Sequence, residues 1–124
     1  MPSSYQQKGS RAERLAQNYL SLKGYTIISK NYRSRLGEID IIAKENGKIV
    51  FIEVKAKYSA RFGSPKWAVT HRKQKKISIL ALEYLKSTGQ SYAKARFDVI
   101  AIFYPKNSPP QIELVKNAFE LAYR

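Results

Sequence analysis

The sequence predicts an α/β fold in which a mixed β-sheet is flanked by helices, in the order α-β-β-β-α-β-β. Two segments carry apolar residues at helical spacing, and five short segments are rich in β-branched and aromatic residues. The dipeptide Asn46-Gly47 is typical of a tight hairpin turn and joins two of these strands. Without an internal repeat or linker, the 124 residues are expected to form one domain, with 1–8 as a flexible N-terminal tail.

The helices and strands follow from the periodicity of the apolar residues. The first helix is expected from Ser10 to Lys23, where Gly24 follows as a C-terminal cap. A strand over 25–29 and a basic loop over 30–36 come next, and then the hairpin. After a basic, aromatic loop over 57–69, the second helix is expected from about Thr70 to Ser87. Strands over 95–104 and 111–115 and a brief tail helix from Ala118 complete the chain.

The hairpin carries the main functional prediction. A two-residue turn at Asn46-Gly47 pairs Asp40 with Glu53 and Glu38 with Lys55. Because side chains alternate along a strand, these four emerge on one face. The opposite face, expected to be the core face, is wholly apolar: Ile39, Ile41, Ala43, Val50, Ile52 and Val54.

Like charges on directly opposed residues are destabilising unless something neutralises them. A divalent cation such as Mg²⁺, with Mn²⁺ as the alternative, is the economical neutraliser for Asp40 and Glu53. Lys55 is then placed to orient a water or to stabilise charge on a phosphate. The competing interpretation is a solvated, salt-bridged sheet face. A one-residue slip of register would also split the carboxylates between faces.

Charge points to a polyanionic partner. Twenty-three basic against nine acidic residues give a net charge of +14 and a pI near 10.1. Nucleic acid, most simply DNA, is the expected partner, and an anionic membrane is the weaker alternative because no basic amphipathic helix with an exposed apolar face is evident. The absence of cysteine excludes disulfides and thiolate chemistry and fits a cytoplasmic location. No apolar run is long enough for a signal peptide or a membrane span.

Basic residues crowd the start of the second helix, where the helix dipole is already positive. Such a start favours phosphate binding, although a solvated basic face is the alternative. The aromatic side chains of Tyr58, Phe62 and Trp67 are available to stack on bases. The expected phosphate contacts are Arg33, Arg35, Lys57, Arg61, Arg72, Lys73, Lys75 and Lys76.

Four further polar residues have open assignments. Glu13 fits a capping box with Ser10, which is its simplest interpretation. Gln74 lies one turn before Ile77 on the inward side, so it is expected to face the carboxylates. Asp98 either joins the site or pairs with an arginine, and His71 has no partner at ligand spacing and is interpreted as a surface residue.

The arrangement Asp40…Glu53-Val54-Lys55 across a hairpin resembles the active-site motif of the PD-(D/E)XK superfamily of restriction-endonuclease-like phosphodiesterases. More narrowly, the chain resembles the bacterial YraN family, which is similar to archaeal Holliday-junction resolvases. This likeness covers about nine-tenths of the chain. The segments that carry it include Gly9…Glu13, Lys23-Gly24-Tyr25, Asn31-Tyr32-Arg33, 37–43, 51–55, Gly63-Ser64-Pro65, Lys73-Gln74 and 96–99.

The resemblance implies a restriction-endonuclease-like fold, metal binding by Asp40 and Glu53, and catalysis by Lys55. It further implies an additional acidic role for Glu13 and a place near the site for Gln74.

The sequence therefore predicts a Mg²⁺-dependent DNA endonuclease that hydrolyses phosphodiester bonds, with branched or junction DNA as a candidate substrate. Symmetric cleavage of a junction would require a homodimer. The alternatives are a non-catalytic nucleic-acid-binding module that uses the same basic surface, and a subunit whose basic face meets an acidic protein.

Overall fold

The computed structural model describes residues 4–58 and 69–120, and the side chains of 11–58 and 69–120. The described elements confirm the predicted order α-β-β-β-α-β-β. They are α1 (Ser4–Leu22), β1 (Thr26–Ser34), β2 (Gly37–Glu45), β3 (Lys48–Lys57), α2 (His71–Ser87), β4 (Ala95–Phe103) and β5 (Gln111–Phe119). Arg61, Phe62 and Trp67, which were expected to contact nucleic acid, lie outside the described residues.

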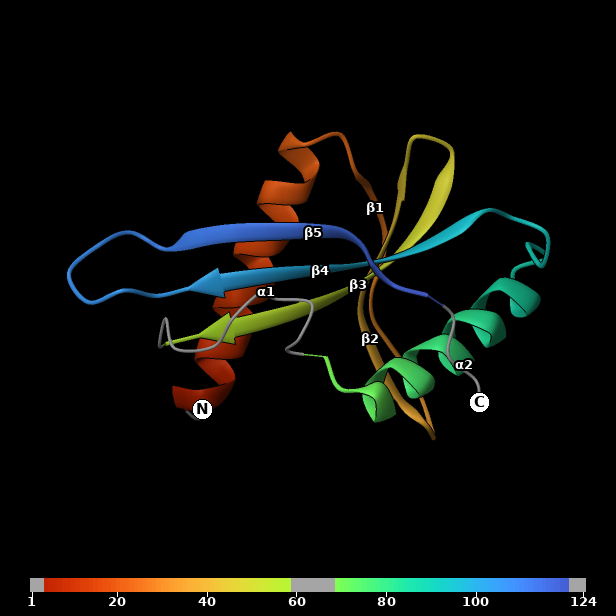
Figure 1. Ribbon diagram of the computed structural model, residues 1–124, viewed down its shortest axis with the longest axis horizontal. Helices are drawn as coiled ribbons and strands as arrows, with labels where there is room; N and C mark the ends of the chain where they lie inside the picture. The colour runs from red at the N-terminus through yellow and green to blue at the C-terminus, as the bar shows by residue number, and fades with distance from the viewer. Residues whose placement is uncertain (1–3, 59–68, 121–124) are drawn as a thin grey trace.

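The five strands form one mixed sheet in the order β1-β2-β3-β4-β5. Neighbouring strands are antiparallel except for β3 and β4, which are parallel and are connected through α2. Figure 1 shows β3, β4 and β5 running side by side, while β1 and β2 turn steeply away from them. This divergence gives the sheet the strong twist that side-chain sterics favour.

Each face of the sheet is covered by one helix. Helix α1 packs Ala12, Ala16 and Leu20 on one face, whereas α2 packs its apolar stripe on the other. The α2 core centres on Phe51, whose ring stacks on Phe97 at 5.6 Å and meets Tyr84 edge-on at 5.9 Å between ring centroids. Burial on both faces explains the nearly continuous apolar runs of β3 and β4.

The hairpin register is confirmed from Glu45↔Lys48 to Ile41↔Ile52. The turn residues Asn46 and Gly47 have φ values of 53° and 76°, which is the left-handed pair that a tight hairpin needs. However, the expectation of a single core face was wrong. Ile42 and Phe51, on the face of the carboxylates, are fully buried under α2, while Ile41 and Ile52 are buried under α1.

Helix α1 begins at Ser4, six residues earlier than predicted, so residues 4–8 are helical and were wrongly assigned to a flexible tail. Its C-terminal end agrees with prediction. Gly24 has a φ of 94°, and the Tyr25 N–H donates to the Leu20 carbonyl as in a Schellman cap.

Two other boundaries also differ from prediction. The basic segment 30–34 continues β1 because Tyr32 packs edge-on against Tyr84, with 5.4 Å between ring centroids. The segment from Ala118 begins no helix within the described residues. Instead, Phe119 ends β5, pairs with Phe97, and stacks on its ring at 4.9 Å.

Candidate metal centre

Asp40 lies where β2 separates from β3. The ladder between these strands ends at Ile41↔Ile52, so the next residue toward the start of β2 is free to turn its side chain into the fork. There Asp40 Oδ2 accepts a hydrogen bond of 2.8 Å from the Val54 N–H, in place of a backbone carbonyl. The fork therefore fixes the Asp40 carboxylate between two strands, and burial raises the pKa of this half-buried group.

Glu53 is the most buried carboxyl group of this region, with only 6% of its side chain exposed. Its Oε1 lies 3.6 Å from Lys55 Nζ and 3.8 Å from Lys73 Nζ. Its Oε2 is enclosed, and no donor among the described residues reaches it. Burial, followed by the charge of Asp40, raises the pKa of Glu53 to about 7, because both disfavour the ionised carboxylate.

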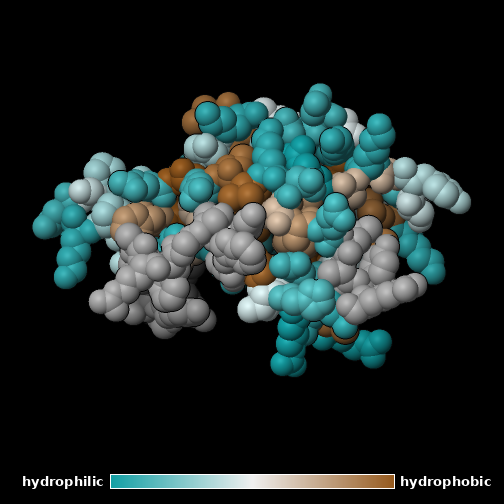
Figure 2. All heavy atoms as spheres, in the orientation of Figure 1, coloured by the Kyte–Doolittle hydropathy of each residue, from teal (hydrophilic) through white to brown (hydrophobic). Residues whose placement is uncertain are grey.

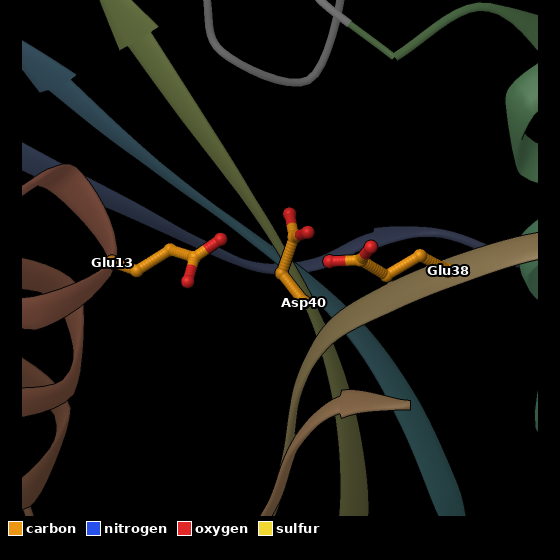
Figure 3. Close-up of side chains that lie close together, drawn as sticks. All are labelled: Glu13, Glu38 and Asp40. Atoms are coloured by element: carbon orange, nitrogen blue, oxygen red, sulfur yellow. The ribbon is translucent and has the colours of Figure 1, made fainter. Parts of the chain in front are cut away.

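Two more carboxylates converge on Asp40 from different elements. Glu13 reaches it from α1 and Glu38 from earlier in β2, and one oxygen of each of the three lies within 4.8 Å of the others. Figure 3 shows Glu13 and Glu38 pointing at Asp40 from opposite sides. Burial and then the charges of Asp40 and Glu38 raise the pKa of Glu13. We call Glu13, Glu38, Asp40 and Glu53 the acidic cluster.

The position of Glu13 overturns the capping-box interpretation. Because α1 begins at Ser4, Ser10 lies inside the helix and cannot be its N-cap. The Glu13 carboxylate points instead toward the sheet, where it meets Asp40. This residue had the weakest functional support in the sequence alone.

The acidic cluster has the composition that a divalent cation requires. Hard cations take several oxygen ligands, and Glu13, Glu38 and Asp40 could hold such an ion. The enclosed Glu53 Oε2 adds a second, independent indication, because a buried carboxylate oxygen without a donor carries a desolvation cost. A cation bound beside it would remove that cost, so the residues fit a metal ion.

Positive side chains surround the acidic cluster on two sides. Lys55 and Lys73 contact Glu53, and Arg33 Nε lies 3.0 Å from Glu38 Oε2. Lys73 belongs to the first turn of α2, which Thr70 caps by accepting a hydrogen bond from the Lys73 N–H. The predicted phosphate contact Lys73 thus lies at the acidic cluster itself, which no sequence signal indicated.

The other predicted phosphate contacts are spread over neighbouring surfaces. Arg72 and Lys76 are exposed, Lys75 is half-buried, and the first turn of α2 contains no acidic residue. Figure 2 shows hydrophilic side chains projecting where α2 begins. Arg35 is exposed after β1, and Lys57 is half-buried at the end of β3.

Gln74 is directed at the polypeptide that precedes α2. Its Nε2 donates a hydrogen bond of 3.0 Å to the Val69 carbonyl, which fixes the entry of the chain into the helix. His71 is exposed on the first turn of α2, as expected for a surface residue. No interaction described for Gln74 reaches the acidic cluster.

Asp98 pairs with an arginine and belongs to a separate network. It is fully buried and accepts hydrogen bonds from Arg96 at 2.8 and 2.9 Å, from the Tyr25 hydroxyl at 2.8 Å, and from the Asn117 N–H at 2.9 Å. Arg96 also bridges to Glu45 at 2.9 Å. These partners account for the charge of Asp98 without a metal.

Sequence reasoning placed Glu38 on the face of Asp40 but did not include it among the metal ligands. The signal was present, because residues two apart in a strand share a face. Asn31 was expected in a loop, whereas the structure places it in β1, where its side chain opposes the rise in the pKa of Glu13.

None of the helices in the described ranges 4–58 and 69–120 is long and apolar enough to cross a membrane. The model of the uncharacterised protein family UPF0102 matches residues 12–102, which include the whole acidic cluster.

Curated relatives extend this likeness over nearly the full chain. A UPF0102 protein of Desulfosudis oleivorans is 47% identical over 120 residues, which cover 97% of this chain and 95% of the relative. One of Geobacter metallireducens is 50% identical over 115 residues, 93% of both chains, and one of Rhodococcus jostii is 45% identical over 111 residues, 90% of this chain and 94% of the relative. The chain therefore belongs to the uncharacterised protein family UPF0102, the YraN family.

Proposed function

We propose that this protein is a divalent-metal-dependent nuclease that hydrolyses phosphodiester bonds in DNA. The observation that carries the proposal is the enclosed Glu53 Oε2, which has no donor among the described residues and lies beside the Asp40 carboxylate. In a chain of net charge +14, such a cluster of acids would repel a polyanion unless cations lie between them.

Asp40 and Glu53 would hold the ion, with Glu13 and Glu38 as further oxygen ligands. When bound, a divalent ion supplies polarisation of a phosphoryl oxygen and a lowered pKa of a coordinated water. Mg²⁺ fits this role because it is usually held by one or two carboxylates together with waters and phosphates.

Lys55 would orient the attacking water or stabilise negative charge that develops on the phosphate. Its ammonium lies 3.6 Å from Glu53 Oε1, so it is already held at the acidic cluster. Lys73 lies at a similar distance on the α2 side and would contact a phosphate of the bound strand. The exposed Arg72 and Lys76 extend this contact along α2.

A cleavage assay with Mg²⁺ or Mn²⁺ tests the proposal on duplex, single-stranded, flap and four-way-junction DNA. Wild type is expected to cut at least one substrate, and Asp40→Asn or Glu53→Gln to lose about 100-fold or more of that activity. Lys55→Met is expected to lose cleavage while it retains metal binding, because the lysine is not a ligand. Glu83→Gln is a matched control, since it removes an exposed carboxylate of α2.

Two results would contradict the proposal. Cleavage by Glu53→Gln at the rate of wild type would exclude the acidic cluster as the active site. DNA binding without cleavage of any substrate by wild type would favour the non-catalytic nucleic-acid-binding module.

A further inference from the structure

Three basic side chains neutralise part of the acidic cluster. Glu53 Oε1 lies 3.6 Å from Lys55 Nζ and 3.8 Å from Lys73 Nζ. Across the β1–β2 pair, Arg33 Nε lies 3.0 Å from Glu38 Oε2. A divalent ion would use the same carboxylates as ligands. The ion and the basic side chains therefore compete for the same negative charge.

The charge balance of the acidic cluster changes sign when an ion binds. Four carboxylates against three basic side chains leave a formal charge of −1, which one divalent ion turns into +1. In the empty site the basic side chains are engaged by carboxylates. Beside a bound ion their charge is in excess, and they become available to the phosphates of a polyanion.

The ion pairs of Glu53 are loose compared with those of Asp98. Asp98 accepts hydrogen bonds of 2.8 and 2.9 Å from Arg96, the length expected for charge-assisted bonds. The two lysines lie farther from Glu53, at 3.6 and 3.8 Å, and its Oε2 has no donor among the described residues. The lysines thus supply charge without filling the hydrogen-bonding capacity of Glu53, so an ion can replace them at little cost.

Lys73 and Arg33 are placed to change partner. Their side chains are 39% and 73% exposed, so each reaches both a carboxylate of the acidic cluster and the solvent. Lys73 lies in the first turn of α2 beside the exposed Arg72, where the helix dipole favours anions. Its ammonium is carried on a flexible stem, and it can turn from one anion to another without moving the backbone. The exposed ion pair of Arg33 contributes little stability.

We propose that Lys73 and Arg33 are exchangeable counter-ions: they neutralise Glu53 and Glu38 in the empty metal centre and turn to substrate phosphates once a divalent ion binds. This inference rests on the proposed metal-dependent function and adds to it a coupling between the two ligands. The metal ion and DNA would raise each other's affinity by the same factor.

Calorimetric titration of Mn²⁺ into wild type, Lys73→Met and Arg33→Met tests the inference in the absence of DNA. We expect Lys73→Met to bind Mn²⁺ about 10-fold more tightly than wild type, because the ion no longer competes with an ammonium group beside Glu53. Arg33→Met is expected to gain about 2-fold, since its ion pair is screened by solvent. Lys73→Arg keeps the charge and should bind Mn²⁺ like wild type. A side chain needed only for folding would show the opposite effect, a weaker binding of Mn²⁺.

Fluorescence anisotropy with a labelled duplex, in EDTA and in Mn²⁺, measures the coupling from the side of DNA. Lys55→Met serves as the background, because it is expected to bind the metal without cleavage. In this background Mn²⁺ should tighten DNA binding, and Lys73→Met should lower that tightening about 5-fold. Lys76→Met is the matched control, since it removes an exposed lysine one turn further along α2. The control should weaken DNA binding equally in EDTA and in Mn²⁺ and leave the affinity for Mn²⁺ unchanged.

The two proposals fail in different ways. If wild type binds Mn²⁺ and Lys73→Met binds it no more tightly, the inference is wrong and the proposed function stands. An equal effect of Mn²⁺ on DNA binding with and without Lys73 would likewise overturn it. If wild type binds no Mn²⁺, both the proposed function and the exchange of counter-ions are excluded.

Discussion

Glu53 bears the largest electrostatic cost of the acidic cluster. Its carboxyl group is almost fully buried, faces Asp40, and is only partly compensated by Lys55 and Lys73 at 3.6 and 3.8 Å. Without a metal ion, the fold lowers this cost by retaining a proton on Glu53 up to about pH 7. If a cation binds beside Glu53, it removes this electrostatic cost, and the free energy released adds to the affinity of the site for the cation.

This cost predicts how stability depends on pH without metal. The pKa of Glu53 is raised from 4.5 to about 7, so between these values the unfolded chain loses a proton that the folded chain retains. The free energy of unfolding is therefore expected to fall from about pH 4.5 to pH 7 on account of Glu53, and to level off above. Urea unfolding in EDTA, followed by circular dichroism, measures this profile.

Glu53→Gln isolates the contribution. At pH 8 the variant is expected to be more stable than wild type by on the order of 3 kcal/mol, since one pKa unit corresponds to about 1.4 kcal/mol. At pH 4.5 the two should be nearly equal. Glu83→Gln, at an exposed position, should follow the wild-type profile throughout. Equal stability of Glu53→Gln and wild type at pH 8 would show that Glu53 is not strained by its surroundings.

At the scale of elements, polar networks join strands at two separate places. The acidic cluster joins α1, β2 and β3, whereas Asp98 and Arg96 of β4 bind Tyr25 before β1, Glu45 at the end of β2, and Asn117 of β5. The Asp98 network therefore connects β4 to both edges of the sheet. These contacts give the Asp98 network a structural role.

Asp98→Asn is expected to destabilise the protein by about 3 kcal/mol, because it removes the fully buried one of the two charged partners of Arg96. The affinity for Mn²⁺ should remain that of wild type. Urea unfolding and calorimetric titration of the same preparation separate the two effects. A variant that folds normally but no longer binds Mn²⁺ would instead place Asp98 in the metal centre.

The elements also show which parts of the fold can be predicted from the sequence. Local signals, such as the hairpin turn at Asn46-Gly47, the cap at Gly24 and the start of α2 at Thr70, all gave correct boundaries. The ends of β1 and β5 were misplaced because Tyr32 and Phe119 are held by tertiary ring contacts with no local signal.

The acidic cluster shows the same difference between what local sequence signals predict and what depends on tertiary packing. The hairpin register and strand alternation predicted that Asp40 and Glu53 lie near each other, although the ladder ends at Ile41↔Ile52 and does not pair them directly. The positions of Glu13 and Lys73 depend on how α1 and α2 pack on the sheet, which no short segment specifies.

At the scale of the whole molecule, acidic residues are concentrated and basic residues are spread. Four of the nine acidic residues gather in the acidic cluster, while exposed basic residues lie at the start of α2, at the end of β1 and also on more distant surfaces such as the end of α2. The basic residues next to the acidic cluster would therefore attract a polyanion, and the proposed metal ions would separate its phosphates from the carboxylates. Attraction of this kind is electrostatic and weakens with added salt.

Arg72→Ala/Lys76→Ala is expected to reduce DNA affinity and its dependence on salt. Each phosphate contact contributes about 0.9 to the slope of log affinity against log salt, so the slope should fall by about 1.8. The affinity for Mn²⁺ should not change. Fluorescence anisotropy with a labelled duplex at several salt concentrations gives the slope.

Lys86→Ala/Lys94→Ala is the matched control, because these exposed lysines lie at the end of α2 and beyond it. The control should keep the wild-type slope. If both pairs lower the slope equally, DNA contacts the protein without preference for the start of α2.

The hydrogen bond from the Val54 N–H to Asp40 gives the protein an internal spectroscopic reporter. This amide donates to a carboxylate whose charge changes with pH and which is a ligand of the proposed metal centre. Its nitrogen and proton chemical shifts should therefore follow the state of Asp40 directly. A single resonance of an unmodified chain would report events at the fork, without a dye, a label on a side chain, or a substrate.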